Sequence, residues 1–142
     1  MTSSKNSLLA ALVAVSLIIG PAAAVLAGDA DPLFINLTSD DGHRINMAFS
    51  FGGKQHERGH PLTVFMNDRA VMAASKANAV RFPEQQKAIA DLLADGATII
   101  VCPMCMKHYG VTEDDLLAGL TVGNPETTGA AFFQDNTKVL TW

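Results

Sequence analysis

The sequence predicts an α/β protein: a single domain in which a five-stranded, mostly parallel sheet lies between helices on both faces. Two observations lead to this prediction. Short apolar runs alternate along the chain with longer segments whose apolar residues recur at helical spacing, and turn-forming Gly, Pro, Asp and Asn residues separate them. Regular alternation of strands with helices is typical of a three-layer sandwich built on a parallel sheet.

The composition agrees with one globular domain. Of the 142 residues, 49% are apolar and 17% are charged, as in ordinary folded domains. The net charge of −4 argues against a nucleic-acid partner, which would require a basic surface. Two cysteines are too few for the multi-disulfide framework of a small secreted scaffold.

Residues 1–27 are predicted to be a secretory signal peptide. Lys5 supplies the positive charge, residues 8–19 form the apolar segment, and Gly20 with Pro21 breaks the helix before a small-residue cleavage zone. An apolar segment of about 12 residues is shorter than the ~20 that a membrane span requires.

Two cleavage positions compete, after Ala24 or after Ala27. Cleavage after Ala27 is favoured because the mature chain then starts with polar residues. We therefore expect an exported, periplasmic protein whose folded domain is residues 28–142 and which has no membrane partner after cleavage.

The first elements of the mature chain follow from local pattern. Residues 33–37 are an apolar run ended by a Ser-Asp-Asp-Gly turn, which predicts a buried strand. From Ile45 the apolar residues recur at helical spacing, and Gly59 closes this predicted helix. Residues 62–66 form the second predicted strand.

The middle of the chain repeats this alternation. Asp68 is expected to cap a helix over residues 69–79. Pro83 begins the next predicted helix, which ends at Asp95-Gly96. Residues 97–101 follow as the third strand and are the most continuously apolar run of the mature chain.

Beyond Cys102 the elements become shorter. Thr112 and Asp115 resemble a capping box for one helical turn, and residues 120–122 form a short strand. Asn124 is expected to cap a helix that starts at Pro125, and residues 137–142 form the last strand.

The fold class predicts where a site lies. In open parallel sheets, ligands bind beyond the carboxyl ends of the strands, where the strand order reverses. With the strand order 2-1-3-4-5, the loops at residues 38–44 and 102–109 face each other across that crevice. The second loop contains both cysteines.

Cys102 and Cys105 form a C-x-x-C motif at a junction between a strand and a helix. Pro103 suits the first helical position, so Cys102 lies at a helix N-terminus, where the dipole and free amides favour a thiolate. Cys105 is one helical turn further on, close enough to form a disulfide, resolve a persulfide or share a metal.

Several chemistries are compatible with this motif. Covalent haem attachment is excluded because Met106, not His, follows the second cysteine, and a structural zinc site lacks a second C-x-x-C. A Cu(I) site is an alternative, because Cys102, Cys105, Met104 and Met106 are soft ligands and His108 is close in sequence. A thioredoxin-like protein fits less well, since its motif follows an early strand.

His43 is a candidate third catalytic residue. It lies in the loop expected to face Cys102, where an imidazole could hydrogen-bond a thiolate or polarise a substrate. The competing interpretation is that this Asp- and Gly-rich turn only caps the following helix.

The mature chain resembles the DsrE/DsrF-like family, and more closely its exported branch with a Cys-Pro-Met-Cys motif. The resemblance covers residues 32–142 and rests on five stretches: residues 34–38, 57–61, 102–111, 122–126 and 137–142. It implies a five-stranded sheet between helices and assembly into homo-oligomers, trimers or hexamers. In cytoplasmic members a cysteine eight residues before a Gly-Val pair carries sulfur as a persulfide. The matching residue here is Cys102, before Gly110-Val111.

The resulting expectation is an exported protein of sulfur or thiol chemistry. Cys102 carries a persulfide or cycles redox equivalents, with Cys105 as the resolving thiol and a sulfur donor or acceptor, protein or small molecule, as partner. No cofactor is expected. The alternative is a periplasmic Cu(I)-binding module that uses Cys102, Cys105 and nearby Met or His side chains.

Overall fold

The computed structural model describes residues 30–142, so the predicted signal peptide at residues 1–27 lies outside the described residues. The elements, with η for 3-10 helices, are in chain order β1 (Leu33–Leu37), α1 (Gly42–Glu57), β2 (Leu62–Met66), η1 (Asp68–Ala74), η2 (Lys76–Asn78), α2 (Pro83–Ala94), β3 (Thr98–Val101), α3 (Pro103–Tyr109), η3 (Glu113–Asp115), β4 (Thr121–Val122), α4 (Pro125–Phe132) and β5 (Lys138–Thr141).

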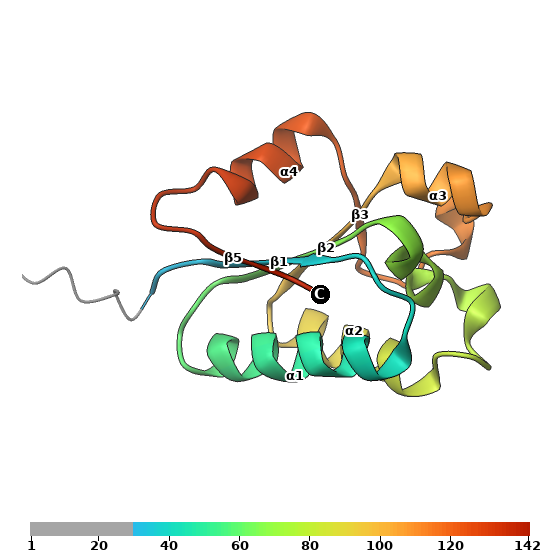
Figure 1. The fold of residues 1–142 in the computed structure, drawn as a ribbon, viewed down its shortest axis with the longest axis horizontal. Coiled ribbons are helices and arrows are strands. Elements are labelled where there is room, and N and C mark those ends of the chain that lie inside the picture. The colour runs from blue at the N-terminus through green and yellow to red at the C-terminus, as the bar shows by residue number, and fades with distance from the viewer. Residues whose placement is uncertain (1–29) are drawn as a thin grey trace, which may run out of the picture.

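The predicted three-layer α/β architecture is confirmed. All five strands are parallel and form one sheet in the order β4-β3-β2-β1-β5. Helices α1 and α2 cover one face of the sheet, and α3 and α4 lie on the other (Figure 1). Within residues 30–142, none of the helices has the length and apolar character required to cross a membrane.

The main core lies between the sheet and the α1–α2 layer. Alternate residues of a strand face one side of a sheet, and in β1 and β2 the members of one alternating set are all buried. Helix α1 buries one stripe of side chains and α2 another. The fully buried core side chains from these elements and β3 include Ile35, Leu37, Ile45, Val64, Met66, Ile89, Ile99 and Val101.

Gly52 allows α1 to approach the sheet closely. A Cβ atom at this position would lie 2.8 Å from the Cδ1 of Ile35 and 3.2 Å from the side chain of Leu62. A larger residue would therefore push α1 away from β1 and β2, so the missing side chain helps to set the spacing of these two layers.

The prediction of an α-helix over residues 69–79 is wrong. The segment forms two 3-10 helices, η1 and η2, separated at Ser75, which pairs in an isolated antiparallel bridge with Leu116. Ser75 has an extended conformation in this bridge, so the segment is not one continuous helix. Asp68 is not the N-cap of η1, because Asn67 occupies that position.

The strand order assumed from the sequence is also wrong. The order 2-1-3-4-5 would place β1 beside β3, whereas β2 lies between them and pairs with both. The strand order reverses at β1, which has β2 on one side and β5 on the other. The loop after β3 is therefore next to the loop after β2 and not next to the loop after β1.

Candidate dithiol site

The two cysteines lie at the carboxyl edge of the sheet, where β3 passes into α3. The N–H of Cys102 donates to the carbonyl of Met66, the last residue of β2, over 3.0 Å. The Cys102 carbonyl accepts the first hydrogen bond of α3, from Met106, and Gly110 ends the helix with a left-handed φ of 73°. Backbone contacts at both ends thus hold the short helix that presents the thiols.

Both cysteines are free, half-buried thiols. The Sγ of Cys105 accepts a hydrogen bond of 3.0 Å from the backbone N–H of Asp68, the second residue after β2. Burial raises the pKa of the Cys105 thiol and the adjoining Cys102 thiol raises it further, whereas the Asp68 N–H lowers it. The net effect is a raised pKa, which keeps Cys105 protonated at neutral pH.

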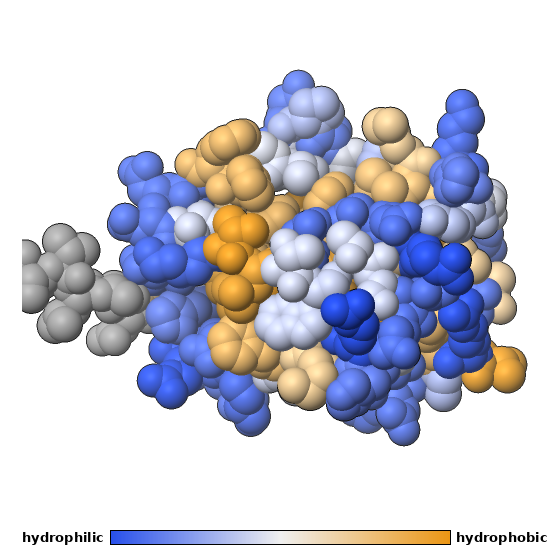
Figure 2. Space-filling view, viewed as in Figure 1, coloured by the Kyte–Doolittle hydropathy of each residue, from blue (hydrophilic) through white to orange (hydrophobic). Residues whose placement is uncertain are grey.

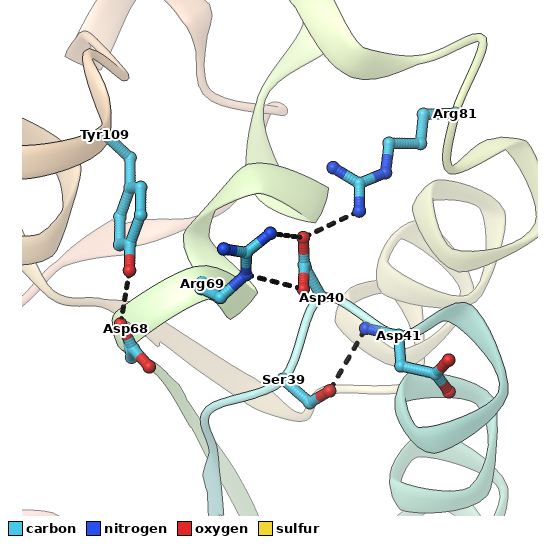
Figure 3. A network of polar contacts seen from close by, with 7 residues as sticks. All are labelled: Ser39, Asp40, Asp41, Asp68, Arg69, Arg81 and Tyr109. Atoms are coloured by element: carbon cyan, nitrogen blue, oxygen red, sulfur yellow. Dashed lines mark hydrogen bonds and ion pairs between the residues drawn. The ribbon is translucent and has the colours of Figure 1, made fainter.

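Tyr109 completes this side of α3. It follows Cys105 by four residues, so the two side chains lie on the same side of the helix. The Tyr109 hydroxyl donates to the Oδ1 of Asp68 over 2.5 Å (Figure 3). The hydrogen bond to this carboxylate raises the pKa of Tyr109, so the hydroxyl remains a donor. Asp68 thus contacts α3 twice, through its backbone and through its side chain.

A second polar cluster adjoins the first. Arg69 donates to both oxygens of the Asp40 carboxylate, over 2.8 and 2.9 Å, and Arg81 donates to the same carboxylate over 2.6 Å (Figure 3). The hydrogen bond from Arg69 is the main reason why the pKa of Asp40 falls from 3.8 to about 2. The cluster joins the loop after β1 to η1 and to the segment before α2.

His43, the predicted third residue, lies in α1 and not on the segments that adjoin the cysteines. His43 is an exposed residue in the first turn of α1, and no hydrogen bond in residues 30–142 joins it to Cys102 or Cys105. The expectation depended on β1 lying beside β3. Because β2 lies between them, Asp68 occupies the place beside the thiols that was expected for His43.

The side chains of the alternative Cu(I) site differ strongly in exposure. Met106 is 4% exposed and belongs to the hydrophobic core, whereas Met104 is 80% exposed. His108 is exposed and its ring packs edge-on against Tyr109. In the described part of the chain, no three His, Cys, Asp or Glu side chains gather in a way that could hold a metal ion.

Tyr109 and Arg81 belong to the site but were not predicted from the sequence. The i, i+4 spacing of Cys105 and Tyr109 indicates that they share one side of α3, but the sequence does not reveal which loop faces that side. Arg81 belongs to the segment between η2 and α2, far from Asp40 in sequence, and no local pattern links it to that carboxylate.

The fold and the site define a small α/β protein with a free dithiol at the carboxyl edge of a parallel sheet. The chain belongs to the DsrE/DsrF-like family, whose sequence model matches residues 33–142. No curated protein matches the chain.

Solved structures with the same fold share little sequence with this chain. The protein of unknown function MTH1491 from Methanobacterium thermoautotrophicum has a TM-score of 0.65 at 15% identity, over 78% of this chain and 98% of its own. The YchN protein from E. coli has a TM-score of 0.62 at 17% identity, over 80% and 99%. The protein of unknown function BT1422 from Bacteroides thetaiotaomicron has a TM-score of 0.62 at 22% identity, over 79% and 95%. At these identities the likeness establishes the fold alone.

Proposed function

We propose that this protein carries sulfane sulfur as a persulfide on Cys102, with Cys105 as the resolving thiol. Membership of the DsrE/DsrF-like family, which is usually connected with sulfur relay, supports this chemistry. The observation that carries the proposal is the pair of free, half-buried thiols one helical turn apart, with a backbone donor directed at the second sulfur. Persulfide chemistry requires an accessible thiolate and no bound cofactor.

Two outcomes are open to sulfur bound on Cys102. An acceptor thiolate can attack the terminal sulfur, which forms a persulfide on the acceptor and returns Cys102 as a thiolate. Alternatively, the Cys105 thiolate attacks the sulfur attached to Cys102. A Cys102–Cys105 disulfide then forms, and the terminal sulfur leaves with the bonding electron pair and takes a proton as hydrosulfide. An external thiol must afterwards reduce the disulfide.

The protonation state of Cys105 decides between these outcomes. Its pKa is raised by burial and, in the unloaded pair, by Cys102, so at neutral pH the resolving residue is mainly a thiol and not the attacking thiolate. At neutral pH the attack by Cys105 is therefore slowed, which favours transfer of the sulfur to an acceptor. Resolution by Cys105 becomes the faster route as the pH increases.

The test is mass spectrometry of the intact, reduced chain after incubation with inorganic polysulfide. The proposal predicts a mass increase of one sulfur atom that is lost in Cys102→Ser. In Cys105→Ser the same adduct forms and persists longer, and after removal of excess polysulfide it releases no further hydrosulfide. Retention of the adduct in Cys102→Ser contradicts the proposal. Binding of added Cu(I) that is lost with either cysteine, without any sulfur adduct, favours the soft-metal alternative instead.

We also propose that the chain acts as a homo-oligomer. Apolar side chains gather over α4 and the edge strand β5 (Figure 2), and Phe132, Phe133 and Val139 are among the exposed large apolar residues, with Phe133 81% exposed. An edge strand such as β5 also has backbone groups free to pair. Val139→Lys is expected to lower the molar mass measured by light scattering, and an unchanged mass argues against this surface.

The expected place of action is the periplasm, on the composition of residues 1–27. Expression of the full chain in a bacterium tests this proposal. Recovery from the periplasm with a mature N-terminus at residue 25 or 28 supports it, and recovery of the uncleaved chain from the cytoplasm contradicts it.

A further inference from the structure

Asp68 has a backbone conformation that is unusual for its residue type. Its φ is +46°, and in residues 30–142 Asn136 is the one other non-glycine residue with a positive φ. The left-handed region is sterically unfavourable for residues with a Cβ, although Asp and Asn enter it more readily than most. Such a conformation persists only where the surroundings hold it, and these residues cluster at functional sites.

The surroundings of Asp68 hold it on both sides. The preceding Asn67 donates from its side chain to Asn36 of β1 over 2.5 Å, and the following Arg69 is fixed by its two hydrogen bonds to Asp40. The Asp68 carboxylate itself accepts the Tyr109 hydroxyl. With its neighbours anchored in this way, the backbone N–H of Asp68 is directed at the Cys105 sulfur, 3.0 Å away.

We propose that Asp68 is a positioning residue that stabilises the reduced form of the dithiol over the Cys102–Cys105 disulfide, through the N–H that its left-handed backbone holds against the Cys105 sulfur. This inference rests on the proposed function in assuming that the pair is chemically active. It adds a residue outside the C-x-x-C motif and assigns it a definite effect on the redox equilibrium of the pair.

The physical reason is the difference between the two states of sulfur as acceptors. Once Cys105 ionises, above neutral pH, its thiolate carries a full charge and accepts a charge-assisted hydrogen bond, whereas a disulfide sulfur is a weak acceptor. A donor fixed next to Cys105 therefore contributes more to the reduced pair than to the oxidised pair. A disulfide whose reduced form is stabilised in this way is more oxidising and more easily reduced.

The ease with which the Cys102–Cys105 disulfide is reduced affects the proposed cycle. Whenever Cys105 resolves a persulfide, the product is the Cys102–Cys105 disulfide, which cannot accept another sulfur atom. A disulfide that is easily reduced returns to the dithiol with a mild thiol reductant. Asp68 thus favours recovery of the carrier after each resolution.

The test compares Asp68→Gly with Asp68→Ala in the full chain. Both variants lose the carboxylate and its contact with Tyr109, and both keep a backbone N–H. Glycine adopts a positive φ freely, whereas alanine does not, so only the alanine variant is expected to turn the N–H away from Cys105. The pair of variants separates the backbone conformation from the side chain.

The measured quantity is the equilibrium between dithiol and disulfide in mixtures of glutathione and glutathione disulfide, at an alkaline pH at which Cys105 is ionised in the reduced chain. Oxidation of the two thiols reduces one glutathione disulfide to two molecules of glutathione, so electrons and protons balance. We expect the equilibrium constant of Asp68→Gly to lie within about twofold of that of the unaltered chain. Asp68→Ala is expected to shift the constant towards the disulfide by about tenfold, as for loss of a hydrogen bond to a charged group. Equal constants for the two variants would overturn the proposal.

A second measurement tests the same backbone contact through the reactivity of Cys105 alone. In a Cys102→Ser background, the rate of Cys105 alkylation by iodoacetamide is measured as a function of pH. Three chains are compared: one that keeps Asp68, one with Asp68→Asn and one with Asp68→Ala. Asparagine tolerates a positive φ, and both substitutions remove the Asp68 charge, which also raises the pKa of Cys105. The alanine profile is therefore expected at higher pH than the asparagine profile. Matching asparagine and alanine profiles would contradict the role of the backbone.

Neither measurement involves persulfide. If polysulfide never loads Cys102 but the glycine and alanine variants differ as expected, the proposed sulfur-carrying function fails and the role of Asp68 stands. If sulfur loads on Cys102 and the two variants are equal, the role of Asp68 fails and the proposed function stands.

Discussion

The guanidinium of Arg69 donates two hydrogen bonds, of 2.8 and 2.9 Å, to the two oxygens of the Asp40 carboxylate. This bidentate pair joins the chain segments that follow β1 and β2, and Arg69 is the immediate neighbour of the residue that donates to Cys105. An ion pair that looks purely structural therefore adjoins the dithiol. It also provides the most direct test of the electrostatics at this edge of the sheet.

Asp40→Asn is expected to destabilise the protein at neutral pH by about 1 kcal/mol. The carboxylate side chain is 13% exposed, but both guanidiniums are more than half exposed, so solvent screens much of the interaction. The pKa of Asp40 is lowered from 3.8 to about 2 on folding. Its contribution is therefore complete above about pH 5 and disappears as the pH falls towards 2.

Urea unfolding at a series of pH values checks this prediction. The difference between the original chain and Asp40→Asn should narrow steadily below pH 4. A difference that is constant from pH 7 to pH 3 would mean that the charge of Asp40 contributes nothing to folding.

The two methionines next to Cys105 are expected to behave differently when truncated. Met106→Ala should cost about 2–4 kcal/mol, because Met106 is 4% exposed in the core and its removal leaves a cavity. Met104→Ala should change stability by less than about 0.5 kcal/mol, because this side chain is 80% exposed. Thermal unfolding of both variants measures the contrast, and a large effect of Met104→Ala would indicate a contact absent from the isolated chain.

His43→Ala is expected to leave sulfur loading of Cys102 unchanged within about twofold. His43 is exposed in the first turn of α1, and β2 separates β1 from β3. The rate of persulfide formation with polysulfide at fixed pH is the measurement, with Cys102→Ser as the inactive control. A tenfold loss in His43→Ala would place the imidazole in the site in spite of the strand order.

Cys105 is expected to react slowly with alkylating reagents at neutral pH. Burial and the Cys102 thiol raise its pKa, so the reactive thiolate is scarce until the pH exceeds the usual thiol value of about 8.5. Peptide mapping after brief iodoacetamide treatment at pH 7 and pH 9 measures the modified fraction at each cysteine. Complete modification of Cys105 at pH 7 would contradict the raised pKa.

Local pattern was sufficient for most of the fold. Apolar runs bounded by turns placed β1 and β2 correctly, and Pro83 and Pro125 marked the first residues of α2 and α4. These features are encoded over a few neighbouring residues. Residues 69–79 were assigned to the wrong helix type because Ser75 pairs with Leu116, a contact between segments that are distant in sequence.

The sequence by itself determined the fold class, the family resemblance and the C-x-x-C motif that bears the reactive thiols. Only the tertiary structure decided which residues surround these thiols. Pairing of β2 with β3 places Asp68, and not His43, beside Cys105. The physical reason is that strand order depends on how apolar faces of sheet and helices pack over the whole domain, whereas a motif depends only on its own few residues.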